Sequence, residues 1–309
     1  MLGHTFSIKR MQTHDGPGFR TTVFMKGCAL RCAWCHNPES LSAGQEVWLD
    51  ENKCIGCGLC YDHGGVRTTH DNWNGDIRVA ESCPSKALEL LRRTWTVEEL
   101  VGEIERDAAF IEDGGVTFSG GEPAQQWRFV AEAMEACKAR KLHTALDTCG
   151  AATSSAFEAL LAHADLVLFD LKILDPDEHR KWTGQDNRQI MANLRQTAER
   201  VRNNESRLWI RTPLIPEATA TVDNISDIGG YVRDELSDAV DRWELCSFNN
   251  LCVEKYRWME MDWRFSESPL LDRSVAEELF GIAMESSGLE NGRLFLKGRF
   301  QSVFGKLSI

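Results

Sequence analysis

Residues 19–37, FRTTVFMKGCALRCAWCHN, place an apolar segment directly before three closely spaced cysteines. The first part, 19–27, is rich in the β-branched and aromatic residues that are typical of a strand. Cys28, Cys32 and Cys35 follow with the spacing C-x3-C-x2-C. Because ligands of open α/β sheets bind beyond the carboxyl ends of the strands, we expect the three thiols at that edge of a sheet.

The rest of the chain alternates between strand and helix patterns, which predicts βαβ units around a parallel sheet. Thr96 followed by Glu99 is typical of a capping box at the start of the first helix. Six units fall short of the eight in a complete TIM barrel, so the predicted fold is α/β, a partial (β/α)6 TIM-like barrel. The further expected strands are 115–119, 143–148, 165–173, 207–215 and 242–248, and the expected helices are 96–111, 124–140, 154–164, 187–203 and about 222–236.

The composition excludes several classes of function. The chain has 309 residues, with 35 Lys and Arg against 47 Asp and Glu, which gives a net charge of −12. An acidic chain without a basic stretch is a poor nucleic-acid binder. No apolar run reaches the about 18 residues of a transmembrane helix, and the first residues lack the apolar region of a secretory signal. The sequence therefore predicts a cytoplasmic protein with no nucleic-acid or membrane partner.

Seven of the eleven cysteines lie in the first 83 residues. Disulfides are rare in the cytosol, so clustered cysteines there indicate metal binding or redox chemistry. Cys28, Cys32 and Cys35 are one ligand short of a structural zinc site, which would need His36 or a distant cysteine as its fourth ligand. An iron–sulfur cluster held by three thiolates is the other interpretation, and it leaves one iron open.

Residues 50–90 interrupt the alternation with a segment rich in Gly, Asn, Asp and Cys. We interpret it as a small ferredoxin-like Fe–S insertion after the first strand, within a core domain that spans 1–309. Its cysteines follow the spacing C-x2-C-x2-C and then Cys-Pro, and four thiolates suffice for one auxiliary [4Fe-4S] cluster. A zinc knuckle is the alternative. The four cysteines are Cys54, Cys57, Cys60 and Cys83.

The three-cysteine motif resembles the signature of the radical S-adenosylmethionine (SAM) enzymes, and residues 15–40, DGPGFRTTVFMKGCALRCAWCHNPES, resemble the opening of the glycyl-radical-enzyme activating enzymes. The resemblance implies that Cys28, Cys32 and Cys35 hold a [4Fe-4S] cluster whose open iron chelates SAM. It implies an oxidoreductase in which the reduced cluster cleaves SAM to methionine and a 5′-deoxyadenosyl radical, which takes a hydrogen atom from a glycine Cα. It also implies a glycyl radical enzyme as protein substrate, a flavodoxin or ferredoxin as electron donor, and a monomer when free.

Further motifs carry the resemblance: GGVTFSGGEP (114–123), LDTCG (146–150) and LFDLK (168–172). They imply that Lys172 meets the SAM carboxylate, although a structural Asp170–Lys172 salt bridge is the plainer interpretation. The residues implied to hold the SAM amino group are Ser119, Gly120, Gly121 and Glu122, and Arg211 and Asn224 are implied as further SAM contacts. Asp147, Thr148, Asp170 and the Leu168 carbonyl are implied to form a monovalent-cation site next to the SAM carboxylate.

The loop Asp15-Gly16-Pro17-Gly18 has the composition of a tight turn. The resemblance implies more, namely that Asp15, Gly16 and Gly18 contact the glycyl segment of the partner. Trp34 and His36 are implied to lie against the first cluster, where they would shield it or tune its potential.

The chain also departs from the family pattern. Glu217 stands where the family usually has glycine, and Asn249 and Cys252 replace a histidine and a glycine near the C-terminus. Two alternatives remain: a radical SAM enzyme that acts on a small molecule or peptide, and a non-catalytic electron carrier with two clusters. The identity of the activated enzyme does not follow from the sequence.

Overall fold

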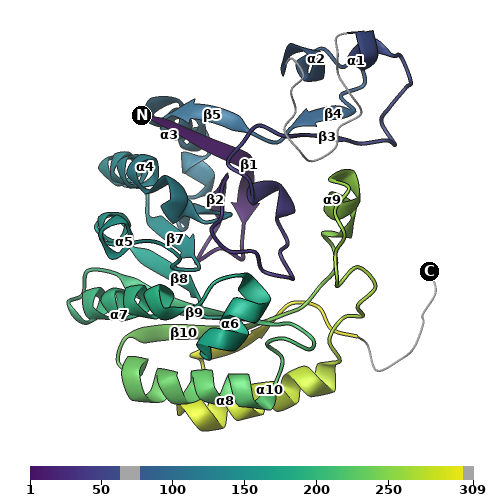
Figure 1. The fold of residues 1–309 in the computed structure, drawn as a ribbon. Coiled ribbons are helices and arrows are strands. Elements are labelled where there is room, and N and C mark those ends of the chain that lie inside the picture. The colour runs from purple at the N-terminus through teal and green to yellow at the C-terminus, as the bar shows by residue number, and fades with distance from the viewer. Residues whose placement is uncertain (63–76, 302–309) are drawn as a thin grey trace.

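The computed structural model describes residues 1–62 and 77–301, and these build one curved nine-stranded sheet with helices on its outer face (Figure 1). The strand order is β11-β10-β9-β8-β7-β6-β2-β1-β5. The strands are β1 Leu2–Gln12, β2 Arg20–Met25, β5 Arg93–Thr96, β6 Gly115–Gly120, β7 Thr144–Thr148, β8 Leu166–Asp170, β9 Arg207–Leu214, β10 Val240–Ser247 and β11 Leu294–Lys297.

The sheet from β2 to β11 is parallel throughout, and it contains all six predicted strands. β1 runs antiparallel to β2, and β5 antiparallel to β1. Within the described ranges, β5 and β11 form the two edges and do not pair with each other, so the barrel is open. The predicted parallel α/β architecture is confirmed.

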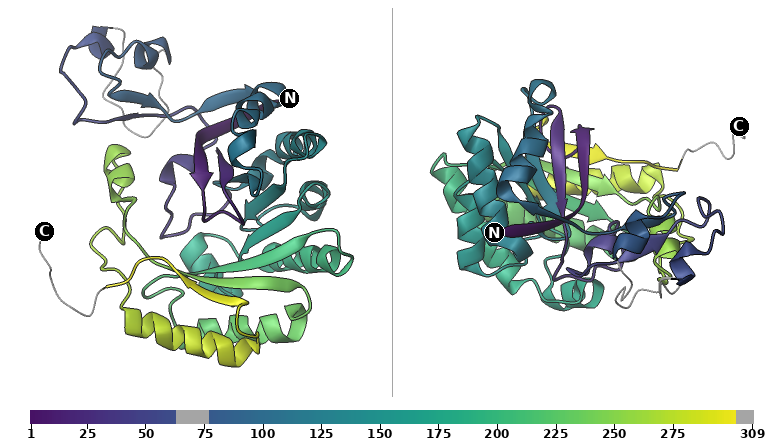
Figure 2. Two further views of the ribbon diagram at one scale, coloured as in Figure 1. Left: turned by 180° about the vertical axis from the view of Figure 1, so that it is seen from behind. Right: turned by 90° about the horizontal axis from the view of Figure 1, so that it is seen from above.

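The helices cover the outer face of the sheet (Figure 2). They are α3 Val97–Glu105, α4 Trp127–Ala139, α5 Ser154–Leu161, α7 Arg188–Arg202, α8 Val222–Tyr231 and α10 Arg273–Ser287. Two further helices, α6 Pro176–Thr183 and α9 Val253–Trp258, contribute Trp182 and Tyr256 to a separate apolar cluster with Trp34. The capping box at Thr96 and Glu99 is present, but α3 ends at Glu105, before the predicted 111. The predicted helix 222–236 divides into α8 and a π-helical turn over Val232–Leu236.

The central strands are apolar on both faces because helices cover one side and the barrel interior the other. Phe118 of β6 and Phe169 of β8 belong to the main core under the helices. Leu168 of β8 and Trp209 of β9 belong to a separate, smaller cluster, and they alternate with main-core residues along these strands. No described helix is long and apolar enough to cross a membrane.

Part of the predicted insertion forms a small lobe beside the sheet (Figure 1). It contains a two-stranded antiparallel pair, β3 Val47–Leu49 with β4 Leu88–Leu90, and two short helices, α1 Leu59–Asp62 and α2 Ile77–Glu81. Cys60 and Cys83 pack against its apolar cluster. Residues 63–76 of the predicted insertion lie outside the described residues, and its ferredoxin-like character stays a prediction.

Candidate active site

A cavity of about 800 Å³ lies inside the curved sheet, and most of the predicted site residues line it. They come from the cysteine loop, from the 15–18 loop and from the ends of strands β6 to β9. The predicted residues in its wall are Asp15, Gly16, Gly18, Cys28, Cys32, Trp34, Cys35, Ser119, Gly120, Gly121, Asp147, Thr148, Asp170, Lys172 and Arg211. Glu122, Leu168 and Asn224 are not in the wall.

The loop that carries the three cysteines is held by main-chain contacts to distant parts of the chain. The amide of Ala33 donates to the Trp182 carbonyl at the end of α6, at 2.9 Å. The Trp263 indole donates to the Ala33 carbonyl at 3.0 Å, and the Tyr256 hydroxyl donates to the Cys35 carbonyl at 2.9 Å. These contacts occupy the main-chain polar groups, while the thiols of the loop line the cavity.

The residues around the cysteines fit a bound iron–sulfur cluster. In the described part of the chain, no three His, Cys, Asp or Glu side chains are grouped closely enough to hold one metal ion. A four-iron cluster takes each thiolate on a different iron, so its ligands lie further apart. His36 lines the cavity, and its buried Nε2 has no hydrogen-bond partner among the described residues. An unpaired polar atom beside the thiols is available to a sulfide of a bound cluster.

The three thiols differ in pKa because their surroundings differ. Burial raises the pKa of Cys32 to about 11 and raises that of Cys35 further. The pKa of Cys28 is lowered, chiefly by the neighbouring Cys149 thiol. Iron binding replaces the thiol proton, so the protein without iron holds Cys32 and Cys35 as thiols.

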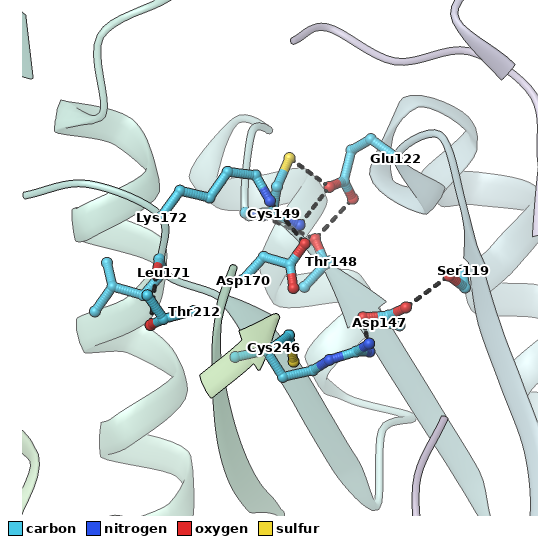
Figure 3. Close-up of polar contacts among 12 residues, drawn as sticks. Ser119, Glu122, Asp147, Thr148, Cys149, Asp170, Leu171, Lys172, Thr212 and Cys246 are labelled. Atoms are coloured by element: carbon cyan, nitrogen blue, oxygen red, sulfur yellow. Dashed lines mark hydrogen bonds and ion pairs between the residues drawn. The ribbon is translucent and has the colours of Figure 1, made fainter. Parts of the chain in front are cut away.

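The carboxylate of Glu122 is fully buried and braces the ends of two strands (Figure 3). Its Oε1 accepts from the Thr148 hydroxyl at 2.7 Å and from the Ala124 amide at 3.0 Å. Its Oε2 accepts from the amide and the thiol of Cys149 at 2.8 and 2.9 Å. The geometry assigns this side chain a structural task and gives no support to a direct SAM contact.

Gly120 and Gly121 are in the wall for a packing reason that sequence reasoning missed. A Cβ on Gly120 would lie 2.3 Å from the Met25 amide nitrogen, and one on Gly121 would lie 2.4 Å from the Gly27 carbonyl oxygen. The close approach of β2 therefore requires both glycines. Their polar main-chain groups remain at the edge of the cavity.

Asp147 of β7 contacts side chains of β6 and β9 inside the cavity (Figure 3). Its carboxylate accepts from the Ser119 hydroxyl at 2.6 Å and pairs with Arg211 at 3.0 Å. Burial raises the pKa of Asp147 to about 6, and Arg211 counteracts this effect. The same carboxylate raises the pKa of Arg211, so the arginine is always charged.

Lys172 places a cation at the end of β8. Its Nζ lies 2.7 Å from Asp170, which confirms the predicted salt bridge as a contact. Burial lowers the pKa of Lys172, but Asp170 and two nearby thiols raise it more, so the amine stays charged. The Asn224 amide donates to the Lys172 carbonyl at 3.1 Å, so Asn224 holds the main chain of the lysine from behind the wall.

The predicted cation site gains no support from these contacts. The Thr148 hydroxyl donates to Glu122, Asp147 is paired with Arg211, and Asp170 with Lys172. Leu168 is buried in the interior cluster and does not reach the cavity.

The 15–18 loop is fixed from below by a buried arginine. Arg20 is fully buried and donates to the Pro17 carbonyl of the loop at 3.3 Å and to the carbonyls of Gly114 and Val116, both at 2.7 Å. Asp15 accepts from the Thr22 hydroxyl at 2.7 Å. Gly18 has φ +67°, and a Cβ there would lie 2.3 Å from the Asp113 carbonyl oxygen. The loop is therefore one rigid side of the cavity.

The departures from the family pattern have structural counterparts. Glu217 has φ +66°, the left-handed conformation that glycine adopts most easily, and its carboxylate pairs with Arg264 at 2.7 Å. Cys252 is buried, with Sγ 3.8 Å from the Cys35 carbonyl oxygen. Asn249 lines the cavity and accepts from the Leu251 amide.

Sequence reasoning missed several charged residues of the cavity. Arg242, Glu244 and Lys297 lie in its wall on β10 and β11. Arg242 is 2.8 Å from Glu244 and stacks on Phe295, with 3.7 Å from guanidinium to ring centroid. The alternation of charged and apolar residues along β10 was the available signal.

The cysteines of the lobe are partly accessible. Cys54 and Cys57 are exposed, whereas Cys60 and Cys83 are half-buried. Their role as cluster ligands stays a prediction.

Comparisons with known proteins agree with this geometry. The family model of the radical SAM superfamily matches residues 22–225. The isethionate sulfite-lyase activating enzyme of Oleidesulfovibrio alaskensis is 35% identical, over 91% of this chain and 94% of its own. The trans-4-hydroxy-L-proline dehydratase activating enzyme of Clostridioides difficile is 36% identical, over 97% and 98%. A radical SAM methyltransferase from Sphaerobacter thermophilus shares the fold, with a TM-score of 0.53 and 13% identity over 93% of this chain and 68% of that one.

An open parallel barrel with three thiols and a buried lysine at its strand ends defines the radical SAM class of enzymes. The chain belongs to the radical SAM superfamily and, within it, to the activating enzymes of glycyl radical enzymes. Membership implies a [4Fe-4S] cluster and SAM as cofactors, and a protein partner.

Proposed function

We propose that this protein activates a glycyl radical enzyme by removing a hydrogen atom from one glycine Cα of that partner. One observation carries the proposal: the three thiols, Lys172 and the 15–18 loop, separated in sequence, line the same cavity. When bound, the [4Fe-4S] cluster and SAM supply the 5′-deoxyadenosyl radical that takes the hydrogen atom.

The chain's own residues bind and orient SAM. Cys28, Cys32 and Cys35 would hold the cluster, and Lys172, which stays charged beside Asp170, would meet the SAM carboxylate. Ser119 and Arg211 present polar groups to the remaining polar atoms of SAM, with Asp147 fixing both. Trp34 is buried beside the cysteines and excludes water.

The open side of the barrel suits a polypeptide segment. Asp15, Gly16 and Gly18 form one rigid rim, and the glycyl loop of the partner would lie along it. We further propose that the protein is a cytoplasmic monomer and that a flavodoxin or ferredoxin donates the electron to its cluster.

The lobe would hold one auxiliary [4Fe-4S] cluster on Cys54, Cys57, Cys60 and Cys83. Support comes from their spacing and from the half-buried Cys60 and Cys83 on a common apolar cluster. A monovalent cation beside Asp147 and Asp170 is the least supported part, because both carboxylates are paired with cations of the protein.

Anaerobic reconstitution with iron and sulfide tests the proposal. We expect about eight irons per chain and about four in the variant with serine at the four lobe cysteines. The reduced protein should convert SAM to methionine and 5′-deoxyadenosine. Zinc in place of iron, or iron without any SAM cleavage, would contradict the proposal, and the second result would favour an electron carrier.

A further inference from the structure

The short helix α9 packs against both the cysteine loop and the lobe. Its Lys255 directs all three ammonium protons at the segment that follows the third cysteine. Lys255 Nζ lies 3.0 Å from the His36 carbonyl oxygen, 3.0 Å from Asn37 Oδ1 and 2.5 Å from Glu39 Oε1. An ammonium group has three donors, so this lysine is fully used.

Glu39 needs this lysine. The residue is 3% exposed, and its second oxygen, Oε2, is buried without a hydrogen-bond partner in the described residues. A buried carboxylate without a counter-charge is strongly unfavourable. The fully buried Lys26 donates to the Glu39 main-chain carbonyl and to Glu46, both at 2.8 Å, but not to the Glu39 carboxylate. Lys255 therefore supplies the ion pair that makes the buried position of Glu39 tolerable.

Two residues close to Lys255 on α9 contact the cysteine loop and the lobe. The Tyr256 hydroxyl donates to the Cys35 carbonyl at 2.9 Å. Trp258 meets Trp48 of β3 edge to face, with 4.9 Å between ring centroids. α9 thus contacts Cys35 directly, the 36–39 segment through Lys255, and the lobe through Trp258.

Lys255 and Glu39 are outside the cavity wall, whereas Cys35, His36 and Asn37 are part of it. The Lys255–Glu39 pair therefore reaches the cavity through residues 35–39, by way of their main chain and of the Asn37 side chain, which Lys255 contacts directly. That segment contains one cluster ligand, Cys35, and His36, whose buried Nε2 has no hydrogen-bond partner among the described residues.

We propose that Lys255 is a positioning residue that holds residues 35–39 in the conformation in which Cys35 and His36 meet the cluster. The inference rests on the proposed function, because it requires a cluster at Cys28, Cys32 and Cys35. A purely structural ion pair would change thermal stability alone. A positioning residue changes the cluster and its response to SAM as well.

The test uses the reconstituted full-length protein and four variants: K255M, K255R, E39Q and the double variant E39Q/K255M. K181M is the matched control, since Lys181 forms an exposed ion pair with Glu178. Two quantities are measured anaerobically, the rate at which an iron chelator removes iron and the change in the electron paramagnetic resonance (EPR) spectrum of the reduced protein on adding SAM. Circular dichroism shows which variants fold.

We expect K255M to lose iron at least about fivefold faster and to show an altered or smaller SAM-dependent change. K255R should restore much of both properties because it keeps the charge. E39Q/K255M should be less impaired than K255M, because no unpaired carboxylate remains. If K255M does not fold, K255R and the comparison of E39Q with E39Q/K255M still test the inference.

The inference is overturned if K255M matches the wild type and K181M in both measurements or, where K255M does not fold, if E39Q/K255M matches E39Q in both. It is also overturned if K255M loses thermal stability with an unchanged SAM-dependent spectrum. A wild type that holds no SAM-responsive cluster would instead contradict the proposed function, so the two failures are distinguishable.

Discussion

Glu122 and Cys149 are joined twice: one carboxylate oxygen of Glu122 accepts from both the amide and the thiol of Cys149, at 2.8 and 2.9 Å. This contact ties the segment after β6 to the segment after β7, directly behind the cavity wall. Because the Glu122 side chain is fully buried, its four hydrogen bonds must all come from the protein.

Glu122→Gln should lower the free energy of unfolding by about 2 kcal/mol, because the new amide group would face a buried donor. Urea denaturation of the reduced protein without iron measures the change. Glu98→Gln, at an exposed position in the first turn of α3, is the control and should be neutral. Equal stability of the two variants would show that the hydrogen bonds of Glu122 do not contribute to the free energy of unfolding.

Lys172→Met should weaken SAM binding about thirtyfold, since a buried charge-assisted contact contributes about 2 kcal/mol. Anaerobic calorimetry on the reconstituted protein gives the dissociation constant. Lys181→Met on the exposed surface of α6 is the control. Unchanged SAM affinity in Lys172→Met would remove this lysine from the site.

Gly18→Ala should separate SAM cleavage from activation of the partner. The alanine Cβ would collide with the Asp113 carbonyl and would need φ +67°, so the 15–18 loop must move. We expect about tenfold less glycyl radical, with SAM cleavage largely kept. Gly102→Ala is the control, because that glycine is exposed on α3 with no atom near its added Cβ. A parallel loss of both activities would contradict this role of the loop.

The stability of the folded protein should depend on pH through the Asp165 carboxyl. Burial raises the pKa of this carboxyl, but Lys138 and Thr144 lower it more, and the net direction is downward. A lowered pKa in the folded state stabilises the protein above the unfolded pKa, and this stabilisation is lost as the pH falls through the folded pKa. Asp165→Asn should therefore cost about 1 kcal/mol at neutral pH, because the group is partly exposed.

The cost of Asp165→Asn should shrink as the pH is lowered below about 4. Urea denaturation at a series of pH values measures it. A constant difference between wild type and variant at every pH would mean that the carboxylate charge is irrelevant.

The six predicted parallel strands could be recognised by their β-branched, aromatic and aliphatic residues, and the first four also by the polar motif that follows each of them. Residues 165–173 are an example, since β8 ends at Asp170 and Lys172 follows. β1, β5 and β11 were missed for physical reasons. β5 and β11 are four-residue edge strands, and β1 has few apolar residues because most of its length is only partly buried.

The walls of the site were predictable, but the supports behind them were not. The spacing of Cys28, Cys32 and Cys35 alone indicates a metal or cluster site. The contact between Lys255 and Glu39 spans 216 residues, and neither position has a local pattern that marks it. Arg20 looked like an ordinary strand residue, yet it is buried under the 15–18 loop. The contacts by which Glu122 braces two strand ends were not predictable, because only the tertiary structure reveals which way a buried carboxylate points.

The most direct test of the account is EPR spectroscopy of the reconstituted, reduced protein mixed anaerobically with SAM and a glycyl radical enzyme encoded beside it. The account predicts a glycyl radical doublet on the partner and about one 5′-deoxyadenosine per radical. The same mixture with Cys35→Ser should give neither. Formation of 5′-deoxyadenosine without a glycyl radical on any neighbouring partner would contradict the account.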